Sequence, residues 1–265
     1  MTQLNWKPSP AIKVTAMIHL GAAAAIAGGV SWPWAAGVLL LNHVGLTTAG
    51  LWPRSTLLGV NVLTLPENAR LARQIAITID DGPNPEVTPK VLDILDEFSA
   101  KASFFCIGQA VETYPVLARE ILRRGHRIEN HSYSHPHHFS LMGTRKLREE
   151  IMRAQNIIAQ TTGHTPQYFR APAGLRNPLL DPVLQSLDLK LVTWTRRGFD
   201  TVTTNADTVL ARLETHLKPG DILLLHDGHC ANTAAGMPVI LEVLPKLLKT
   251  LLQKEFRAIS LPYAA

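Results

Sequence analysis

Two adjacent acidic side chains, Asp80 and Asp81, stand at the end of the apolar segment 75–79. Neighbouring ionised carboxylates repel each other and lose solvation, so a chain keeps them chiefly where a cation or a proton transfer uses them. Further along, His131 and His135 stand four positions apart. One carboxylate and two imidazoles predict a metal site with open coordination positions, and the second carboxylate is then a candidate base.

The elements that must position these side chains alternate from about residue 73 onward. We expect strands at 74–80, 101–107, 126–130, 167–170, 189–194, 221–226 and 256–260, and helices near 87–98, 110–124, 144–161, 178–187, 207–218 and 236–253. Nearly continuous apolar strands with helices between them predict a parallel sheet covered on both faces. Seven such units predict an α/β fold of the closed or nearly closed β/α barrel type.

The candidate reactive residues all follow predicted strands. In β/α barrels the chemistry lies where strands end and loops begin. The residues that follow the first, third, fourth, fifth and sixth predicted strands are Asp80 with Asp81, His131 with His135, Arg170, Asp200 and His226. They are therefore expected at one end of the barrel, which a random distribution would not favour.

A long uncharged segment precedes the predicted barrel, with no Asp, Glu, Lys or Arg at 14–52. A membrane span needs about 20 apolar residues, so this segment has room for nearly two. Glycines and a Trp-Pro-Trp sequence interrupt it at 28–34 and suit an interfacial turn. We expect a helical hairpin over 14–31 and 35–52 that lies in a lipid bilayer, with a re-entrant or surface-lying segment as the alternative.

The flanking charges suggest how such a hairpin would be oriented. Lys7, Lys13 and Arg54 flank the uncharged segment, and basic residues favour the cytoplasmic side of a membrane. We therefore expect a membrane-associated part at 1–60 and a catalytic domain at 70–265, on the cytoplasmic face of a bacterial inner membrane. A single span would place the domain on the other face.

Composition bounds the remaining possibilities. The 265 residues are 46% hydrophobic, enough for a full core, and the formal net charge is +5. The Lys and Arg are scattered, which is typical of solvated faces, and we expect no nucleic-acid partner. With only two cysteines, Cys106 and Cys230, the chain cannot form a disulfide framework or a cysteine-based zinc site. A single disulfide bond between them is possible.

Five motifs resemble those of a known family. They are Thr78-Ile79-Asp80-Asp81-Gly82-Pro83, His131-Ser132-Tyr133-Ser134-His135, Arg170-Ala171-Pro172-Ala173-Gly174, the looser 194–200 and Leu223-Leu224-Leu225-His226. In this order, over about 73–261, they resemble the motifs of the polysaccharide deacetylases, a family of carbohydrate esterases. Each motif alone is weak, but five in register are specific. The resemblance implies a distorted (β/α)7 barrel that removes N-acyl groups from amino sugars.

The resemblance also implies a ligand set. Asp81, His131 and His135 would hold a divalent metal, with zinc expected and cobalt, manganese or nickel as alternatives. Without the family, the two histidines could be ordinary loop residues. His137 and His138 lie beyond the motif and are read as loop histidines.

The resemblance assigns further roles around this metal. Asp80 would be the general base, and Arg170 would orient it and keep it ionised. His226 would protonate the departing amine, with Asp200 raising its pKa. On the residues alone, Arg170 could instead form an ordinary structural ion pair, and Asp200 could be a capping or turn residue.

Three further residues would contact the acyl group. The backbone N–H of Ala173 would stabilise the oxyanion together with the metal. Trp194 and Leu223 would line a pocket for acetyl or formyl, although core packing is the ordinary role of apolar strand residues.

We therefore expect a metal-dependent hydrolase that deacetylates an amino sugar in a polysaccharide or oligosaccharide. Deacylation of a lipid-linked sugar at the membrane is the alternative, and the uncharged segment and the basic balance favour it. A non-catalytic, membrane-anchored binding protein is a third possibility. The presence of every candidate catalytic residue argues against that third interpretation.

Overall fold

The computed structural model describes residues 6–263 and contains one parallel sheet. The strands are β1 (Gln74–Asp80), β2 (Ala102–Cys106), β3 (Arg127–Asn130), β4 (Tyr168–Phe169), β5 (Lys190–Leu191), β6 (Arg196–Arg197), β7 (Ile222–His226) and β8 (Arg257–Ile259). Their order is β5-β4-β3-β2-β1-β7-β6, and β8 also pairs with β1. All of these pairings are parallel, so the carboxyl ends of the strands lie at one edge of the sheet.

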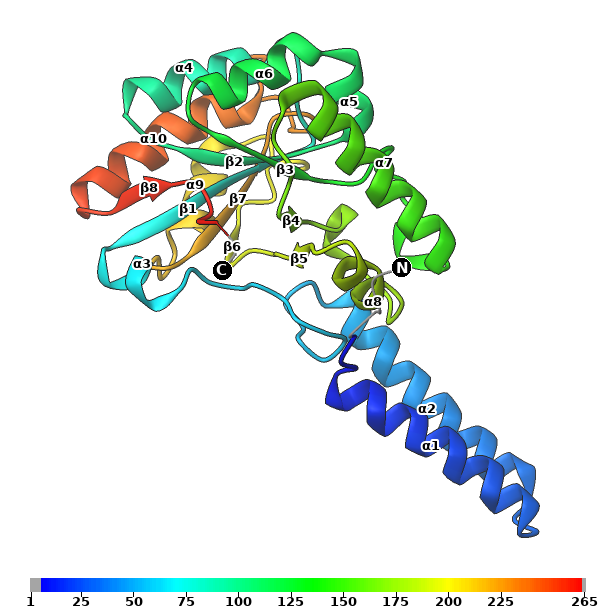
Figure 1. Cartoon of the computed structure of the whole chain (residues 1–265). Coiled ribbons are helices and arrows are strands. Elements are labelled where there is room, and N and C mark those ends of the chain that lie inside the picture. The colour runs from blue at the N-terminus through cyan, green and yellow to red at the C-terminus, as the bar shows by residue number, and fades with distance from the viewer. Residues whose placement is uncertain (1–5, 264–265) are drawn as a thin grey trace.

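Helices cover the outer face of this curved sheet (Figure 1). They are α3 (Glu67–Leu71), α4 (Thr88–Glu97), α5 (Gly108–Thr113), α6 (Pro115–Arg123), α7 (Thr144–Thr162), α8 (Leu180–Ser186), α9 (Ala206–Glu214) and α10 (Val239–Gln253). The largest core cluster joins the inner faces of α4, α6, α9 and α10 to β1, β2 and β7. Burial of these apolar faces is the main favourable term that holds the helices on the sheet.

Side chains along β1 alternate between the apolar core and the polar inner side of the sheet. Ile77 and Ile79 point outward into the helix-covered core cluster. Thr78 and Asp80, which alternate with them, therefore point to the inner side of the curved sheet. Thr78 Oγ1 donates to the carbonyl of Leu223 at 2.6 Å and accepts from Arg170 Nη1 at 2.9 Å. The inner side thus carries hydrogen-bonded polar groups that lead to the end of the strand.

The architecture confirms the predicted distorted barrel, with local differences. The sheet is open between β5 and β6, and the short strand β6 was not predicted. The single helix expected over 110–124 is two helices, α5 and α6, because Pro115 begins a new helix after Tyr114. Both cysteines are free, so the possible bridge between Cys106 and Cys230 is not formed.

The segment before β1 lies against the open side of the sheet. Val62 pairs in parallel with Val192, just after β5. Val62 N donates to Leu191 O at 2.8 Å, and Val62 O accepts from Thr193 N at 3.1 Å. Leu65 N then donates to Gly220 O at 2.9 Å, just before β7. The chain between the N-terminal helices and β1 therefore bridges strands that do not pair with each other.

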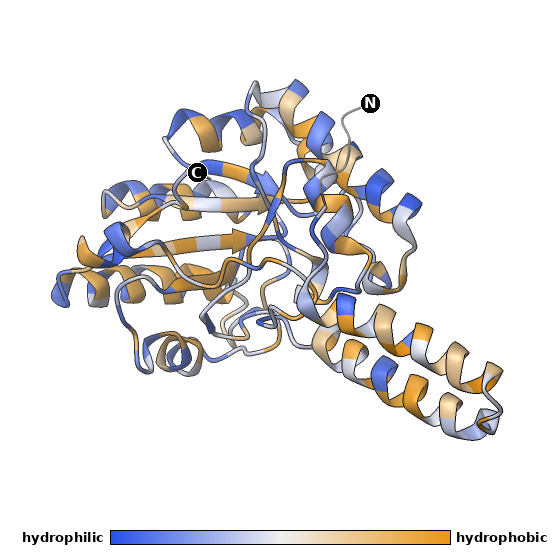
Figure 2. Ribbon diagram, turned by 60° about the horizontal axis from the view of Figure 1, so that its bottom comes forward, coloured by the Kyte–Doolittle hydropathy of each residue, from blue (hydrophilic) through white to orange (hydrophobic). Residues whose placement is uncertain are grey.

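Two antiparallel helices project from the body: α1 (Pro10–Ala27) and α2 (Trp32–Leu51) (Figure 1). They confirm a helical hairpin but begin about four and three residues before the predicted positions, because Ser9 caps α1 ahead of Pro10 and Pro33 stands in the first turn of α2. Both are long and apolar enough to cross a membrane, and few of their residues are buried. Apolar residues predominate along both helices (Figure 2), and many of their large side chains are exposed.

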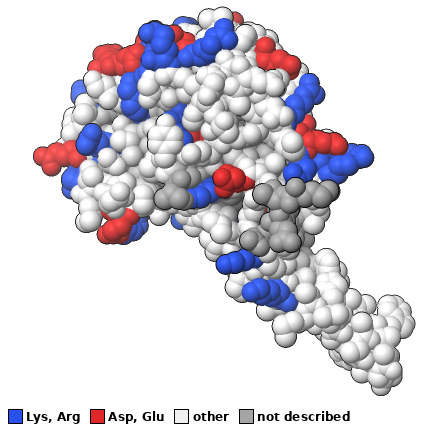
Figure 3. Space-filling view, viewed as in Figure 1, with Lys and Arg blue, Asp and Glu red and all other residues white. Residues whose placement is uncertain are grey.

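Four polar residues of the hairpin form two pairs between α1 and α2. Thr15 Oγ1 donates to Asn42 Oδ1 at 3.1 Å, and the rings of His19 and His43 meet edge to face at 5.2 Å. Such pairs satisfy polar groups between helices in an apolar environment. Charged side chains are scattered over the body, and in this view the outer part of the hairpin carries none (Figure 3).

Candidate active site

Three potential metal ligands converge at the carboxyl ends of β1 and β3. One ligand atom from each of Asp81, His131 and His135 lies within 4.8 Å of the others. Asp81 Oδ1 is 3.3 Å from His131 Nε2 and 3.4 Å from His135 Nε2. The structure thus brings together the three residues that the sequence proposed as ligands.

The backbone and neighbouring groups hold these ligands in place. His131 Nδ1 lies 2.8 Å from the carbonyl oxygen of Arg170. A carbonyl can only accept, so Nδ1 donates to it, and this contact directs Nε2 towards Asp81. Asp81 and His135 have positive φ values of 78° and 49°. Such conformations are costly for these residues and persist where the surrounding structure enforces them, often at functional sites.

The ionisation of the cluster fits a cation. Burial alone raises the pKa of Asp81, but the neighbouring imidazoles of His131 and His229 outweigh it and hold that pKa well below its usual value. Burial lowers the pKa of His135 to about 4, so its imidazole is neutral at pH 7. Asp81 Oδ1 is buried without a hydrogen-bond partner in the described residues. An ionised carboxylate with an unpaired oxygen beside two imidazoles is a donor set that suits zinc.

Asp80 lies next to this cluster and forms an ion pair with the buried side chain of Arg170. Arg170 Nη1 donates to Asp80 Oδ1 at 2.6 Å, and the guanidinium lies 4.1 Å from the centre of the Phe105 ring. Arg170 is fully buried, and burial lowers its pKa, opposed by the charge of Asp80. The other oxygen, Oδ2, is 3.7 Å from His131 Nε2. Asp80 therefore keeps one oxygen directed towards the ligand cluster.

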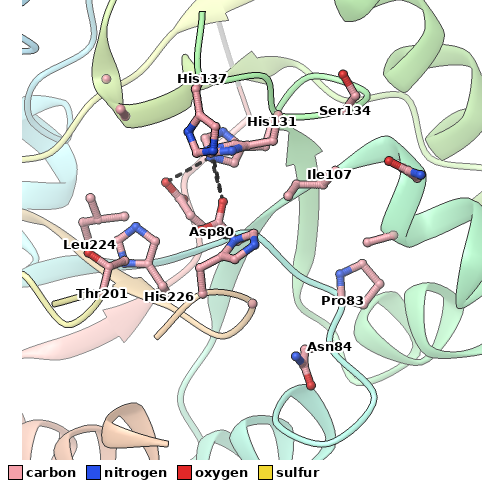
Figure 4. Close-up of a pocket in the computed structure, with 18 of the residues that line it drawn as sticks. Asp80, Pro83, Asn84, Ile107, His131, Ser134, His137, Thr201, Leu224 and His226 are labelled. Atoms are coloured by element: carbon pink, nitrogen blue, oxygen red, sulfur yellow. Dashed lines mark ion pairs between the residues drawn. The ribbon is translucent and has the colours of Figure 1, made fainter. Parts of the chain in front are cut away.

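His226 faces the same pocket from the end of β7. Its Nδ1 donates to Asp200 Oδ1 at 2.8 Å, and its backbone N–H donates to Asp200 Oδ2 at 2.7 Å. Burial lowers the pKa of His226, but the hydrogen bond and charge of Asp200 outweigh it, and the net shift is upward. The interaction fixes the ring and leaves Nε2 for other contacts. Figure 4 shows Asp80, His131, His137 and His226 around this space.

A pocket of about 820 Å³ lies over these groups. Ala173 and Trp194 line it, and Ala173 has a positive φ of 54° in the turn at Pro172–Gly174. Leu223 does not line it and instead packs in the main core, whereas Leu224 lines the pocket. The expectation for Leu223 is therefore wrong by one residue, because successive strand residues point to opposite faces.

Two histidines were missed or given only a loop role. His229 Nδ1 lies 3.0 Å from Asp81 Oδ2, and its ring stacks on that of His135 at 6.0 Å. His137, expected to be an ordinary loop histidine, lines the pocket. His229 follows β7 by three residues, so the rule that placed His226 at the reactive edge could also have identified it.

Comparison with known proteins finds relatives over most of the chain. The family model described as polysaccharide deacetylase matches residues 67–192. A peptidoglycan-N-acetylglucosamine deacetylase of Bacillus cereus is 31% identical over 191 residues, covering 71% of this chain and 67% of the relative. A chitooligosaccharide deacetylase of Sinorhizobium fredii is 34% identical over 214 residues, covering 75% of this chain and 95% of the relative.

The chain belongs to the polysaccharide deacetylase family. Among solved structures, a peptidoglycan N-acetylglucosamine deacetylase in complex with an N-hydroxybenzamide compound has a TM-score of 0.68 and 28% identity, covering 76% of this chain and 91% of that one. The family makes this protein a hydrolase that acts on amide bonds.

The fold is also shared with a protein described as a pseudoenzyme. This carbohydrate esterase family 4 member from Bacillus anthracis has a TM-score of 0.67 and 21% identity, covering 76% of this chain and 66% of that one. At this identity the likeness concerns the fold alone. Catalysis depends on the side chains in the pocket, which the fold alone does not determine.

Proposed function

We propose that this protein removes an N-acyl group, first of all acetyl, from an amino sugar by metal-assisted hydrolysis. The observation that carries this proposal is the grouping of three units in one pocket. The Asp81–His131–His135 cluster is the ligand set, Asp80 with Arg170 is the base, and His226 with Asp200 is the acid. Each unit has the protonation state that its role requires or the contact that orients it.

The base side of the reaction depends on Asp80. A divalent cation held by Asp81, His131 and His135 would polarise the amide carbonyl and lower the pKa of the attacking water. Asp80 accepts a proton from the attacking water as the water oxygen bonds to the carbonyl carbon. Arg170 occupies Oδ1, so Oδ2, on the side of the ligand cluster, is the oxygen that takes the proton.

The acid side depends on His226. When the carbon–nitrogen bond breaks, the nitrogen takes a proton from His226 Nε2 and leaves as the free amine of the sugar, while the acyl group leaves as a carboxylate. Asp200 stabilises the protonated imidazole before this transfer. The backbone N–H of Ala173 is the proposed donor to the oxyanion, and Trp194 and Leu224 are proposed to contain the acyl methyl group.

Mass spectrometry of sugars incubated with the full-length protein tests this proposal. N-acetylated and N-formylated amino sugars, free and lipid-linked, are incubated with and without a chelator. We expect loss of the acyl mass from at least one sugar, abolished by the chelator and restored by added zinc. Unchanged masses under all metal conditions would contradict the hydrolytic function.

A second candidate substrate is a lipid-linked amino sugar, and the contact between the hairpin and the site favours it. The carbonyl of Gly50, in the last turn of α2, accepts from Arg176 N at 3.1 Å. A Cβ built on Gly174, next to Ala173, would lie 2.8 Å from Pro53 and 2.5 Å from Trp194. The base of the hairpin thus contacts the loop that forms one wall of the pocket.

The dimensions of the hairpin suit a bilayer with the site at its surface. The 20 residues of α2 span roughly 30 Å, close to the thickness of the hydrocarbon core. Trp32 and Trp34 at one end and Trp52 at the other are exposed by 70%, 75% and 65%. Tryptophan favours both interfaces of a membrane. In this arrangement the pocket lies near the interface that holds lipid-linked sugars.

A further inference from the structure

The pocket contains one strong cation that the proposed reaction does not use. Of the 23 residues that line it, Arg197 is the sole Arg or Lys. Arg170, the other arginine of the site, pairs with Asp80 and does not line the pocket. A guanidinium remains charged at any physiological pH. Arg197 therefore brings a permanent positive charge to the pocket wall.

This guanidinium is held in place but has no acidic partner. Its central carbon lies 5.3 Å from the centre of the Trp194 ring and 5.0 Å from that of Phe199. Its Nε is buried without a hydrogen-bond partner, and the side chain of Arg197 makes no hydrogen bond or ion pair within residues 6–263. Neighbouring Arg196, by contrast, donates to Asp221 Oδ2 at 3.2 Å. The two adjacent arginines thus have different environments, and Arg197 keeps its donors unused.

Arg197 shares the pocket with the catalytic groups and lies over Trp194. Trp194 and Pro53, at the base of α2, both lie close to Gly174. A planar guanidinium held on aromatic rings presents paired donors that match the oxygens of a phosphate. An anionic group of the substrate would satisfy both the charge and the unused donors.

We propose that Arg197 binds a phosphate attached to C1 of the amino sugar, so that the substrate is a glycosyl phosphate. The inference rests on the proposed deacylation of an amino sugar, and it specifies that substrate further. A lipid-linked sugar and a soluble sugar phosphate share this chemistry. The contact of the pocket wall with the hairpin favours the lipid-linked form.

The test compares sugars that differ in charge, using full-length protein in nanodiscs. The substrates are an uncharged N-acetylated chitooligosaccharide, N-acetylglucosamine 1-phosphate and a polyprenyl-phosphate N-acetylglucosamine. Arg197→Gln is expected to raise KM for the two phosphorylated sugars about ten- to a hundredfold, and to leave KM and kcat for the uncharged sugar within about twofold. Arg197→Lys should fall between, because it keeps the charge but loses the planar fork.

A matched control removes the same charge elsewhere. Arg145 on α7 has an 86% exposed side chain and does not line the pocket, so Arg145→Gln should change no KM. Dependence on Arg197 with both phosphorylated sugars, or with the lipid-linked sugar alone, supports the proposal. Equal losses for charged and uncharged sugars would instead mean that Arg197 only supports the fold, and would overturn it.

Binding measurements separate this proposal from the proposed reaction. Calorimetry measures the affinity of wild type and Arg197→Gln for glucosamine 1-phosphate and for glucosamine. We expect a preference of wild type for the phosphorylated sugar of about tenfold or more, lost in the variant. If wild type shows this preference but turns over no acylated sugar, deacylation is refuted and the phosphate site is retained. If wild type and Arg197→Gln show the same preference, the phosphate site is refuted.

Discussion

At the scale of single residues, two groups in one pocket have pKa values shifted in opposite directions. The pKa of Asp81 is lowered, because the neighbouring imidazoles of His131 and His229 outweigh the effect of burial. The pKa of His226 is raised, because Asp200 outweighs burial there. Such divergence separates a group that stays ionised to hold a cation from a group that stays protonated to act as an acid.

The two neighbouring aspartates should be separable by mutation. Asp81→Ala removes the oxygen between both imidazoles, so we expect loss of bound metal and of activity together. Asp80→Asn keeps the ligand set and removes the proton acceptor, so metal should remain while kcat falls by roughly a hundred- to ten-thousandfold. Elemental analysis and steady-state kinetics on the two variants provide the measurement. Full metal content in Asp81→Ala would refute the ligand assignment, and wild-type kcat in Asp80→Asn would place the base elsewhere.

The raised pKa of His226 predicts a pH dependence. The acid must be protonated, so kcat/KM should decline as pH rises through the pKa of His226. Asp200→Asn removes the carboxylate that raises this pKa and leaves the burial that lowers it. The alkaline limb should then move to lower pH, with kcat at pH 8 reduced about tenfold or more. A pH–rate profile of both proteins measures this, and an unmoved alkaline limb would exclude His226 as the acid.

At the scale of elements, one loop joins the active site to the hairpin. The turn after β4 carries Ala173 into the pocket, and Arg176, just beyond it, donates to Gly50 of α2. Gly50 is buried at this contact, and a Cβ there would meet the carbonyl oxygen of Arg176. The absence of a side chain at residue 50 is therefore what lets α2 approach the loop closely.

A methyl group at this contact should disturb both elements. Gly50→Ala must shift the loop or the helix end, so we expect destabilisation by about 1–3 kcal/mol, lower activity and faster proteolysis between residues 53 and 66. Gly45→Ala is the matched control, since a Cβ at Gly45 on the same helix has nothing within 4 Å. Thermal unfolding and limited proteolysis in nanodiscs measure the difference. Equal behaviour of the two variants would show that the contact contributes nothing.

At the scale of the whole molecule, both ends of the hairpin return to the body. Ser9 Oγ donates to Leu57 O at 2.6 Å, and Trp6 Nε1 donates to Asp181 Oδ2 at 2.7 Å. An inserted hairpin would therefore leave its two ends and the catalytic body on the same side of the membrane. The basic residues near those ends favour the cytoplasmic side.

Membrane insertion and sidedness can be measured together. We expect the full-length protein to resist extraction from membranes by alkaline carbonate, because α1 and α2 would both be inserted. Reporter fusions after Arg54 and at the C-terminus should both report the cytoplasm. Complete extraction would refute insertion, and a C-terminal fusion active outside the cytoplasm would refute the hairpin topology.

The sequence by itself determined the parallel α/β architecture, the hairpin and the residues that meet at the reactive edge. It could do so because apolar periodicity specifies strands and helices, and because parallel strands place the loops that follow them at one edge. The tertiary structure alone decided which face of its strand each residue occupies. It therefore placed Leu224 rather than Leu223 in the pocket wall. It also decided the contacts that join distant segments, such as Arg197 over Trp194 and Gly50 against Arg176. Such contacts depend on packing in three dimensions, which leaves no periodic signal along the chain.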